Sequence, residues 1–335
     1  MYIGRTYKIT EFLFWTRRNL FLLLLISIVP VLLYELLGLQ WLVVPWPIVA
    51  FLGTATAFVV GFKNQQTYNR TWEARDIWGL KIGMSRAWAI MCRDFIKDRD
   101  IAREIAFRHL AWLTVLRYAL RSKRAWENID KSYNREYASL YTIPEREIAL
   151  STVLQKYMRE EELEKVIAAS NPLTQLISLQ SAALARLSDT GALDNARFFE
   201  LHKYLREFST LQARSEKIKN FPYPRQYATV NRIFVWLFCL LLPFAMLKEF
   251  NSFNEFTTGW MKGHMVWLVI PFSMIISWVY TSLDQVGEST ENPFEGSPND
   301  IPISHICYTI ENEIRDIWGD ARPAQTIFNP NNIIM

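Results

Sequence analysis

Four long apolar segments constrain the fold of this chain more than any other feature of its sequence. They run from about residue 20 to 39, 41 to 62, 233 to 247 and 265 to 283. A helix needs about 20 mainly apolar residues to cross a bilayer, and only the third segment is clearly short. Alone it would suit a span or a buried helix equally, but its pairing with the fourth segment across a short loop favours a second spanning hairpin. The sequence therefore predicts an all-α, polytopic membrane protein with four transmembrane helices.

The composition excludes several other classes of protein. The net charge of +4 is modest, and no basic stripe with interleaved aromatic residues suggests a nucleic-acid partner. The three Cys are far apart and the four His lack ligand spacing, so we expect no disulfide framework and no metal site. The P-loop, Gly-x-Ser-x-Gly, His-Glu-x-x-His and Rossmann glycine motifs are missing, so we do not expect an enzyme.

The distribution of Lys and Arg predicts how the four segments are oriented. Basic residues such as Arg17 and Arg18 precede the first segment, and Lys63 and Arg70 follow the second. The loop between these two segments, at residues 38–40, has no basic residue. Because cytoplasmic loops carry the excess of Lys and Arg, both termini and the large middle region are expected in the cytoplasm.

The middle region is expected to be helical, because its apolar residues recur at spacings of three and four among many charges. No Pro interrupts the second apolar segment, which is expected to continue as one helix through Trp72 and Trp78. Further helices are predicted over residues 101–121, over 145–157 behind Pro144, after Asn171-Pro172, and after Asp189-Thr190-Gly191.

These patterns divide the chain into four parts. Residues 1–63 hold the N-terminal segment and the first two transmembrane helices, and residues 64–226 form a helical cytosolic domain. Residues 227–284 hold the third and fourth transmembrane helices. Residues 285–335 form a cytosolic C-terminal segment with an Asn-Pro-Phe motif.

The C-terminal segment opens with a polar, turn-rich stretch directly after the fourth apolar run. Pro293, Gly296 and Pro298 cannot lie inside a regular helix, so a turn is required. Asp300 comes just before an amphipathic pattern over residues 303–317 and is predicted to be the N-cap of a helix there.

The second apolar segment carries the strongest candidate for a functional site. Gly53, Ala57 and Gly61 recur every four residues, a pattern that lets membrane helices pack closely. A second stripe with the same spacing lies one step around the helix. If this helix from several subunits surrounded a common axis, the second stripe would line a narrow, mostly apolar constriction. That stripe consists of Thr54, Phe58 and Phe62. The alternative is that these Phe residues face lipid or pack within one subunit. The polar residues that follow, beginning at Lys63, could form a vestibule or lie at the level of the lipid headgroups.

Four patches, in order along the chain, resemble the bestrophin family, and in particular its prokaryotic members. Together they cover roughly residues 5 to 320. They are Gly61-Phe62-Lys63-Asn64 continuing to Trp78-Gly79, Glu216 to Pro224 followed by Tyr227, Leu242-Pro243-Phe244, and Glu291-Asn292-Pro293-Phe294 continuing to Glu311.

The resemblance implies a homopentameric ion channel with a single axial pore, in which each subunit has four transmembrane helices and a helical cytosolic domain. The apolar neck of the family's pore then falls on Thr54, Phe58 and Phe62, where Thr54 departs from the apolar pattern. A second restriction in the cytosolic domain falls on Phe199, or on Arg197 if the comparison needs a small gap.

The resemblance also bears on calcium. Animal members of the family bind calcium through an acidic cluster after the Asn-Pro-Phe motif. Here only a remnant of that cluster is present, at Asn292, Asn299 and Asp300, and most of its carboxylates are gone. Calcium prefers six to eight oxygen ligands, several of them carboxylates. We therefore expect no metal site and no cofactor.

The predicted function is a chloride channel that also passes other small anions and is embedded in lipid in the cell membrane. For a prokaryotic member this is the bacterial inner membrane. Two alternatives remain open: a cation-conducting channel of the same family, and a non-conducting membrane scaffold or sensor. A secondary transporter is disfavoured, because the spans show no inverted repeat and no pair of broken helices.

Overall fold

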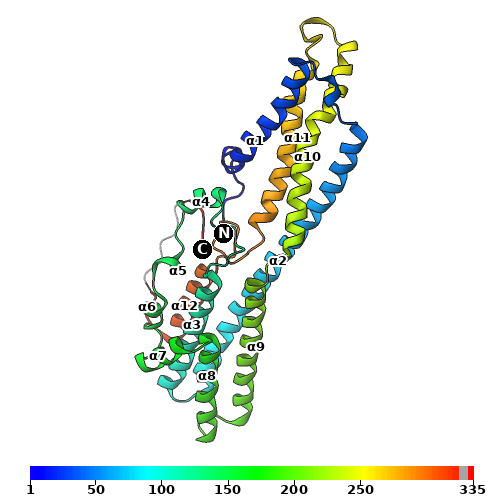
Figure 1. The fold of residues 1–335 in the computed structure, drawn as a ribbon. Helices are drawn as coiled ribbons and strands as arrows, with labels where there is room; N and C mark the ends of the chain where they lie inside the picture. Colours follow the sequence, from blue (N-terminus) through cyan, green and yellow to red (C-terminus); the bar gives the residue numbers. More distant parts are fainter. Residues whose placement is uncertain (324–330) are drawn as a thin grey trace. The chain divides into compact units, whose positions relative to one another are not determined.

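The computed structural model describes residues 1–323 and 331–335, and these are organised almost entirely as helices (Figure 1). Within the described residues the only β-pairing is an isolated bridge between Tyr2 and Ile333. The all-α prediction is therefore confirmed. The chain forms two compact units, each described separately below. The membrane unit comprises residues 4–69 and 223–291, and the extramembrane unit comprises residues 1–3, 70–222 and 292–335.

The membrane unit contains the four apolar segments as helices. Each is long and apolar enough to cross a membrane. The third segment, which looked short in the sequence, is the centre of a 28-residue helix, so it is a span candidate like the others. Helices α1, α10 and α11 lie side by side (Figure 1). The four helices are α1 (Ile9–Glu35), α2 (Trp46–Phe95), α10 (Arg225–Ser252) and α11 (Val269–Ser289).

Helix α2 is a single 50-residue helix. The prediction that the second span continues without a break through Trp72 and Trp78 is confirmed. Its N-terminal part belongs to the membrane unit, and from Arg70 onward it belongs to the extramembrane unit. One continuous helix therefore carries both the candidate neck and part of the extramembrane core.

The extramembrane unit is built around aromatic residues of α2 and its neighbours. Trp78 and Trp88 of α2 are fully buried, as is Trp112 of α3. Helix α3 packs against α8, α9 and α12. The other helices of this unit are α3 (Arg99–Arg121), α4 (Ser132–Ala138), α5 (Pro144–Glu147), α6 (Leu150–Leu154), α7 (Glu160–Ala168), α8 (Pro172–Asp189), α9 (Asn195–Asn220) and α12 (Ile303–Trp318).

Local capping explains why several of these helices start where the sequence predicts. The Asn171 side chain accepts hydrogen bonds from the backbone N–H groups of Leu173 and Thr174, and Pro172 occupies the first helical position of α8. Asp194 accepts a hydrogen bond from the N–H of Arg197 at the start of α9. The starts of both helices are therefore fixed by short-range chemistry.

The predicted helix over residues 145–157 is wrong. Helix α5 ends at Glu147, Ile148 is extended with φ −108° and ψ 130°, and a separate one-turn helix, α6, follows. Tertiary contacts explain the break. The Glu145 carboxylate is buried and accepts a hydrogen bond from Arg117 Nη1 at 2.8 Å. The carbonyl of Ile148 accepts one from the hydroxyl of Tyr118 at 2.9 Å, in place of a helical partner.

The predicted N-cap role of Asp300 is also wrong, although α12 begins at Ile303 as expected. The N-cap residue of α12 is Pro302, which has no side-chain cap to offer. Asp300 instead holds the preceding turn together. Its Oδ2 accepts a hydrogen bond from the N–H of Gly296 at 2.6 Å, and its Oδ1 accepts one from the Ser297 hydroxyl at 2.6 Å. Gly296 has φ +96°, a conformation that favours glycine.

His109 lies in the core of the extramembrane unit and gives it a predictable pH dependence. Burial lowers the pKa of His109 to about 3. Its Nε2 lies 2.8 Å from the Ser85 hydroxyl, and its ring packs against Phe208. In the unfolded chain the pKa of His109 returns to about 6.5. Between about pH 3 and pH 6.5, His109 therefore binds a proton in the unfolded state but not in the folded state. The contribution of neutral His109 is complete above pH 6.5 and is lost as the pH falls toward 3.

We expect this residue to lower the free energy of unfolding by about 2 kcal/mol between pH 6.5 and pH 5, or about 1.4 kcal/mol per pH unit. Chemical unfolding of the purified protein in detergent at several pH values measures this slope. His109→Gln has no titrating ring and should show a slope that is smaller by that amount. Identical slopes in the two proteins would show that His109 does not titrate in this way.

Candidate functional site

Helix α2 has one face that packs inside the membrane unit. At Gly53 the helix meets the ring of Phe238 so closely that a Cβ would lie 2.7 Å from Phe238 Cε2. The carbonyl of Gly53 also accepts a hydrogen bond from the Tyr280 hydroxyl at 3.1 Å. The small residue at 53 therefore serves close helix packing, as the spacing predicts. The buried residues of this face are Val49, Gly53, Thr56, Val60, Lys63 and Thr67.

The other two members of the predicted small-residue stripe do not pack within the chain. Ala57 and Gly61 are exposed, and a Cβ placed on Gly61 would meet no described atom within 4 Å. Their surroundings are therefore supplied by something outside the single chain, either lipid or another subunit.

The candidate neck residues lie on the exposed face of α2. Phe58 is 75% exposed and Phe62 is 47% exposed, and Thr54 is exposed as well. Phe62 makes a ring contact inside the chain, with Tyr227 at a centroid distance of 6.5 Å. The alternative that Phe58 packs within one subunit is wrong. The hydroxyl of Thr54 donates to the carbonyl of Ala50 at 3.0 Å, so it is partly engaged by its own helix.

A buried ion pair lies directly beside the neck residues in the sequence. Lys63, the residue after Phe62, places its Nζ 2.6 Å from Asp284 Oδ1 on α11. The two side chains are only 3% and 11% exposed. The side-chain amide of Asn231 on α10 donates to the same carboxylate oxygen. One carboxylate therefore links three helices of the membrane unit.

The burial and pairing of Lys63 indicate a structural role for this residue. It is buried and paired, so the alternative of an open polar vestibule does not apply to this residue. Its role is to anchor α2 to α10 and α11, next to the exposed aromatic face. The sequence signal that could have found this pair is the lone acid, Asp284, at the end of an otherwise apolar segment, because intramembrane acids usually have a partner.

The two candidates for the cytosolic restriction both lie on α9 and both are exposed. Phe199 is 67% exposed and contacts the ring of Phe198. The guanidinium of Arg197 is 3.2 Å from Asp194 and also lies over the ring of Phe95. The charge of Arg197 is therefore partly compensated inside the chain, whereas the ring of Phe199 is presented to its surroundings.

Asp300 of the calcium-cluster remnant lies against a residue that sequence reasoning missed, Arg121. Its Nη1 donates to the carbonyl of Phe294 at 3.1 Å and lies 3.3 Å from Asp300 Oδ2. Its Nη2 donates to the carbonyl of Ile301 at 3.3 Å. A permanent cation thus occupies the centre of the turn between residues 294 and 301. Nothing in the local sequence of α3 indicates this contact, because Arg121 and Asp300 are far apart along the chain.

The other polar residues of the remnant are engaged in the same turn. Asn292 donates its side-chain amide to Glu295 Oε2 at 3.3 Å, and that oxygen also accepts from the N–H of Asn128. Burial, reinforced by the nearby Asp300 carboxylate, raises the pKa of Glu295. Among the residues that the structure describes, no group of three or more His, Cys, Asp and Glu side chains is arranged to hold a metal ion.

Comparison with known proteins agrees with this architecture. Residues 15–316 match the model of a family described as bacterial/fungal bestrophin protein. The chain belongs to the bacterial/fungal bestrophin family. Together with its four apolar helices, this identifies it as a multi-pass membrane protein of a channel family, in agreement with the prediction that it is not an enzyme.

Curated relatives of this bestrophin carry channel names. It is 28% identical to "Voltage-dependent anion channel-forming protein YneE" of Escherichia coli strain K12, over 88% of this chain and 83% of that protein. It is 23% identical to the voltage-dependent anion channel-forming protein mll4386 of Mesorhizobium japonicum, over 81% of this chain and 75% of that protein.

A solved structure shares the fold of this bestrophin. The crystal structure of a bacterial bestrophin homolog from Klebsiella pneumoniae has a TM-score of 0.74 at 24% identity, covering 91% of this chain and 99% of that chain. The two chains therefore have the same arrangement of helices over nearly their whole length.

Proposed function

We propose that this bestrophin is a homopentameric channel that passes chloride and other small anions through an axial pore. The observation that carries the proposal is the exposed face of α2. Phe58, Phe62 and Thr54 point away from the packed face of the helix, and Phe58 has no ring partner among the described residues of its own chain. In a ring of subunits this face would form a narrow apolar neck.

The anchoring of α2 supports a neck over a merely lipid-facing surface. A helix that only needs to meet lipid has no need of a buried charge pair, since such a pair is expensive to desolvate. The Lys63–Asp284 pair fixes the rotation of α2 at the residue next to Phe62. Fixed rotation is what a constriction requires, because each subunit must present the same ring at the same depth.

Anion preference follows from the chemistry of the neck and from the relatives. A ring of Phe side chains has no formal charge, but ring edges are weakly positive. An apolar constriction also controls ions by dewetting, which penalises the most strongly hydrated species. The relatives named as anion channel-forming proteins support the same choice. The alternatives, a cation channel or a non-conducting scaffold, become outcomes of the measurements below.

We assign the second restriction to Phe199. Arg197 already has Asp194 as an ionic partner, so an Arg ring at this level would carry a compensated charge. An exposed ring at position 199 would narrow the path without adding charge. We propose that both termini lie in the cytoplasm, on the basis of the Lys and Arg distribution. We also propose the inner membrane of a bacterial cell, on the basis of the similarity to bacterial members of the family.

We further propose that the channel works without calcium or another cofactor. Arg121 supplies a built-in positive charge to the turn that carries Asp300, so the carboxylate does not need a metal ion. We expect the same single-channel open probability in calcium and in a calcium chelator. Bilayer recordings that alternate the two solutions measure this directly. A steep rise in open probability with calcium would contradict it.

The assembly itself is tested by counting subunits. Native mass spectrometry of the protein in detergent should show a mass of five chains. Liposomes that contain the protein should then release chloride. A stable monomer would contradict the proposal most strongly, because the four spans of one subunit cannot enclose this pore.

A further inference from the structure

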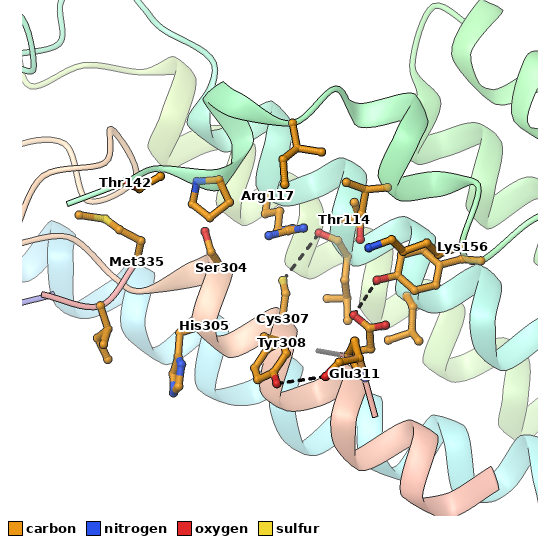
Figure 2. A pocket seen from close by; sticks show the side chains of 18 of the residues that line it. Thr114, Arg117, Thr142, Lys156, Ser304, His305, Cys307, Tyr308, Glu311 and Met335 are labelled. Carbon is orange, nitrogen blue, oxygen red and sulfur yellow. Dashed lines mark hydrogen bonds between the residues drawn. The ribbon is translucent and has the colours of Figure 1, made fainter. Parts of the chain in front are cut away.

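A cavity of about 180 Å³ lies in the extramembrane unit, and none of the candidate neck or restriction residues lines it. Figure 2 shows it from close by. Its walls come from α3, from α12, from the segment that holds α5 and α6, and from Pro323 and residues 333–335. It is called the α3–α12 pocket below. Its size corresponds to roughly six water molecules, which is enough for a small organic molecule.

Hydrogen-bond donors without partners among the described residues line one side of this pocket. Arg117 uses Nη1 to pair with Glu145, but its buried Nε has no such partner. Thr114 lies one helical turn before Arg117, and its hydroxyl makes no hydrogen bond to a described residue. Lys156 makes no ion pair with any described residue. In Figure 2 these three side chains lie along one side of the pocket, across from Cys307 and Glu311.

Among the charged side chains that line the pocket, only Lys156 lacks an ionic partner in the described part of the chain. Arg117 is neutralised by Glu145 at 2.8 Å. Glu311, the acidic residue of the lining, is 2.8 Å from Arg315 and accepts a hydrogen bond from the Tyr157 hydroxyl at 2.7 Å. Lys156 therefore has no counter-charge within the described part of the chain. Two donors, the Lys156 ammonium and the Thr114 hydroxyl, together with the unpaired charge of Lys156, favour an anion with a single negative charge.

Much of the rest of the lining is apolar, although Thr142, Ser304, His305 and Tyr308 also line the pocket. Leu110 and Leu113 of α3 and Val153 of α6 are buried around the pocket, and Ile148 lies at its edge. Burial raises the pKa of Cys307 to about 12, so its thiol remains uncharged and adds to the apolar wall. A bare inorganic anion would leave this surface without contacts.

We propose that the α3–α12 pocket binds a small monocarboxylate that has a short apolar tail. The carboxylate would lie between Lys156 and Thr114, on the side of the pocket formed by Arg117. The tail would lie against the Leu and Val side chains. A ligand of about six non-hydrogen atoms in such a site is expected to bind in the millimolar to submillimolar range.

The position of the pocket gives the ligand a role in controlling the channel. Helix α12 forms one wall, and it follows the last span, α11, through the Arg121-centred turn. A ligand that bridges α3 and α12 would stabilise the contact between these two helices. The regulatory role rests on the proposed channel function, whereas binding does not.

Butyrate is the probe for binding. Thermal unfolding of the full-length protein in detergent should show a saturable rise in midpoint with sodium butyrate, compared with sodium chloride at equal ionic strength. Butyramide, which lacks the charge, and succinate, which has a second charge, should give much smaller shifts. No rise beyond that with chloride, or equal rises with butyramide, would overturn the site.

Two exposed Lys residues provide the matched variants. Lys156→Gln removes the uncompensated charge and should weaken butyrate binding by about tenfold, as expected for a charged hydrogen bond. Lys165→Gln removes the same charge from α7, outside the pocket, and should bind butyrate like the natural protein. Equal affinities for the two variants would also overturn the site.

Recordings of channel current test the regulatory role separately from ligand binding. Butyrate added on the side of the extramembrane unit should change the open probability of the natural protein and of Lys165→Gln, but not of Lys156→Gln at the same concentration. Binding without any change in open probability would overturn the regulatory role alone. Absence of any current, with butyrate binding intact, would contradict the proposed channel function and leave the pocket as a ligand site.

Discussion

Asp284→Asn should lower the free energy of unfolding by about 3–5 kcal/mol, because it leaves the Lys63 ammonium buried without a counter-charge. Lys63 is 3% exposed, and Asp284 is its only ionic partner among the described residues. The introduced side-chain amide would also place two further donors beside a cation. Loss of the ion pair should also let α2 rotate near Phe62. The size of the single-channel current should therefore become heterogeneous.

Two further variants separate the loss of the ion pair from the effect of leaving the Lys63 charge buried without a partner. The double variant Lys63→Met, Asp284→Leu replaces the ion pair with apolar groups of similar size. It should recover part of the lost stability, because the buried amide of Asn231 still loses its acceptor. Glu313→Gln, which breaks the exposed Arg86–Glu313 pair, should change stability little. Chemical unfolding in detergent measures all three. A double variant as unstable as Asp284→Asn would show that the pair itself, and not the orphaned charge, stabilises the unit.

Phe58→Ala should raise the single-channel current by about tenfold, which corresponds to about 1.4 kcal/mol off the barrier for ion passage. Phe58 is the most exposed of the neck aromatics and has no packing role in its own chain, so its removal widens and wets the constriction. For the same reason, the stability of the isolated subunit should change little.

Phe21→Ala is the control for this experiment. Phe21 lies on α1 and is 63% exposed, so it is an aromatic residue of comparable exposure on another helix of the membrane unit. Its truncation should leave the current unchanged. If Phe58→Ala also leaves the current unchanged, or if both variants raise it equally, the exposed face of α2 does not line the pore.

The membrane helices could be predicted from the sequence because their signals are local. Apolar length located the four spans, and the absence of Pro predicted the unbroken course of α2. The helix start at Asn171-Pro172 was also predictable, because a cap acts on the next three residues. The four-residue spacing placed Phe58 and Phe62 on one face of α2, but it left open whether that face packs within one subunit.

What the sequence did not reveal depends on contacts between distant residues. The helix expected over residues 145–157 breaks because Arg117 and Tyr118 of α3 bind Glu145 and the carbonyl of Ile148. Asp300 has the pattern of an N-cap, but it is used by Gly296, Ser297 and Arg121. In both cases tertiary hydrogen bonds outweigh the local preference, for a helix in the first case and for an N-cap in the second.

We propose that anions pass through a pore lined by the exposed face of α2. The most direct measurement is the reversal potential of the purified protein in a planar bilayer with asymmetric sodium chloride. The predicted result is a reversal potential close to the chloride equilibrium potential. A reversal potential close to that of sodium would contradict anion selectivity, and a bilayer with no current at all would contradict the channel.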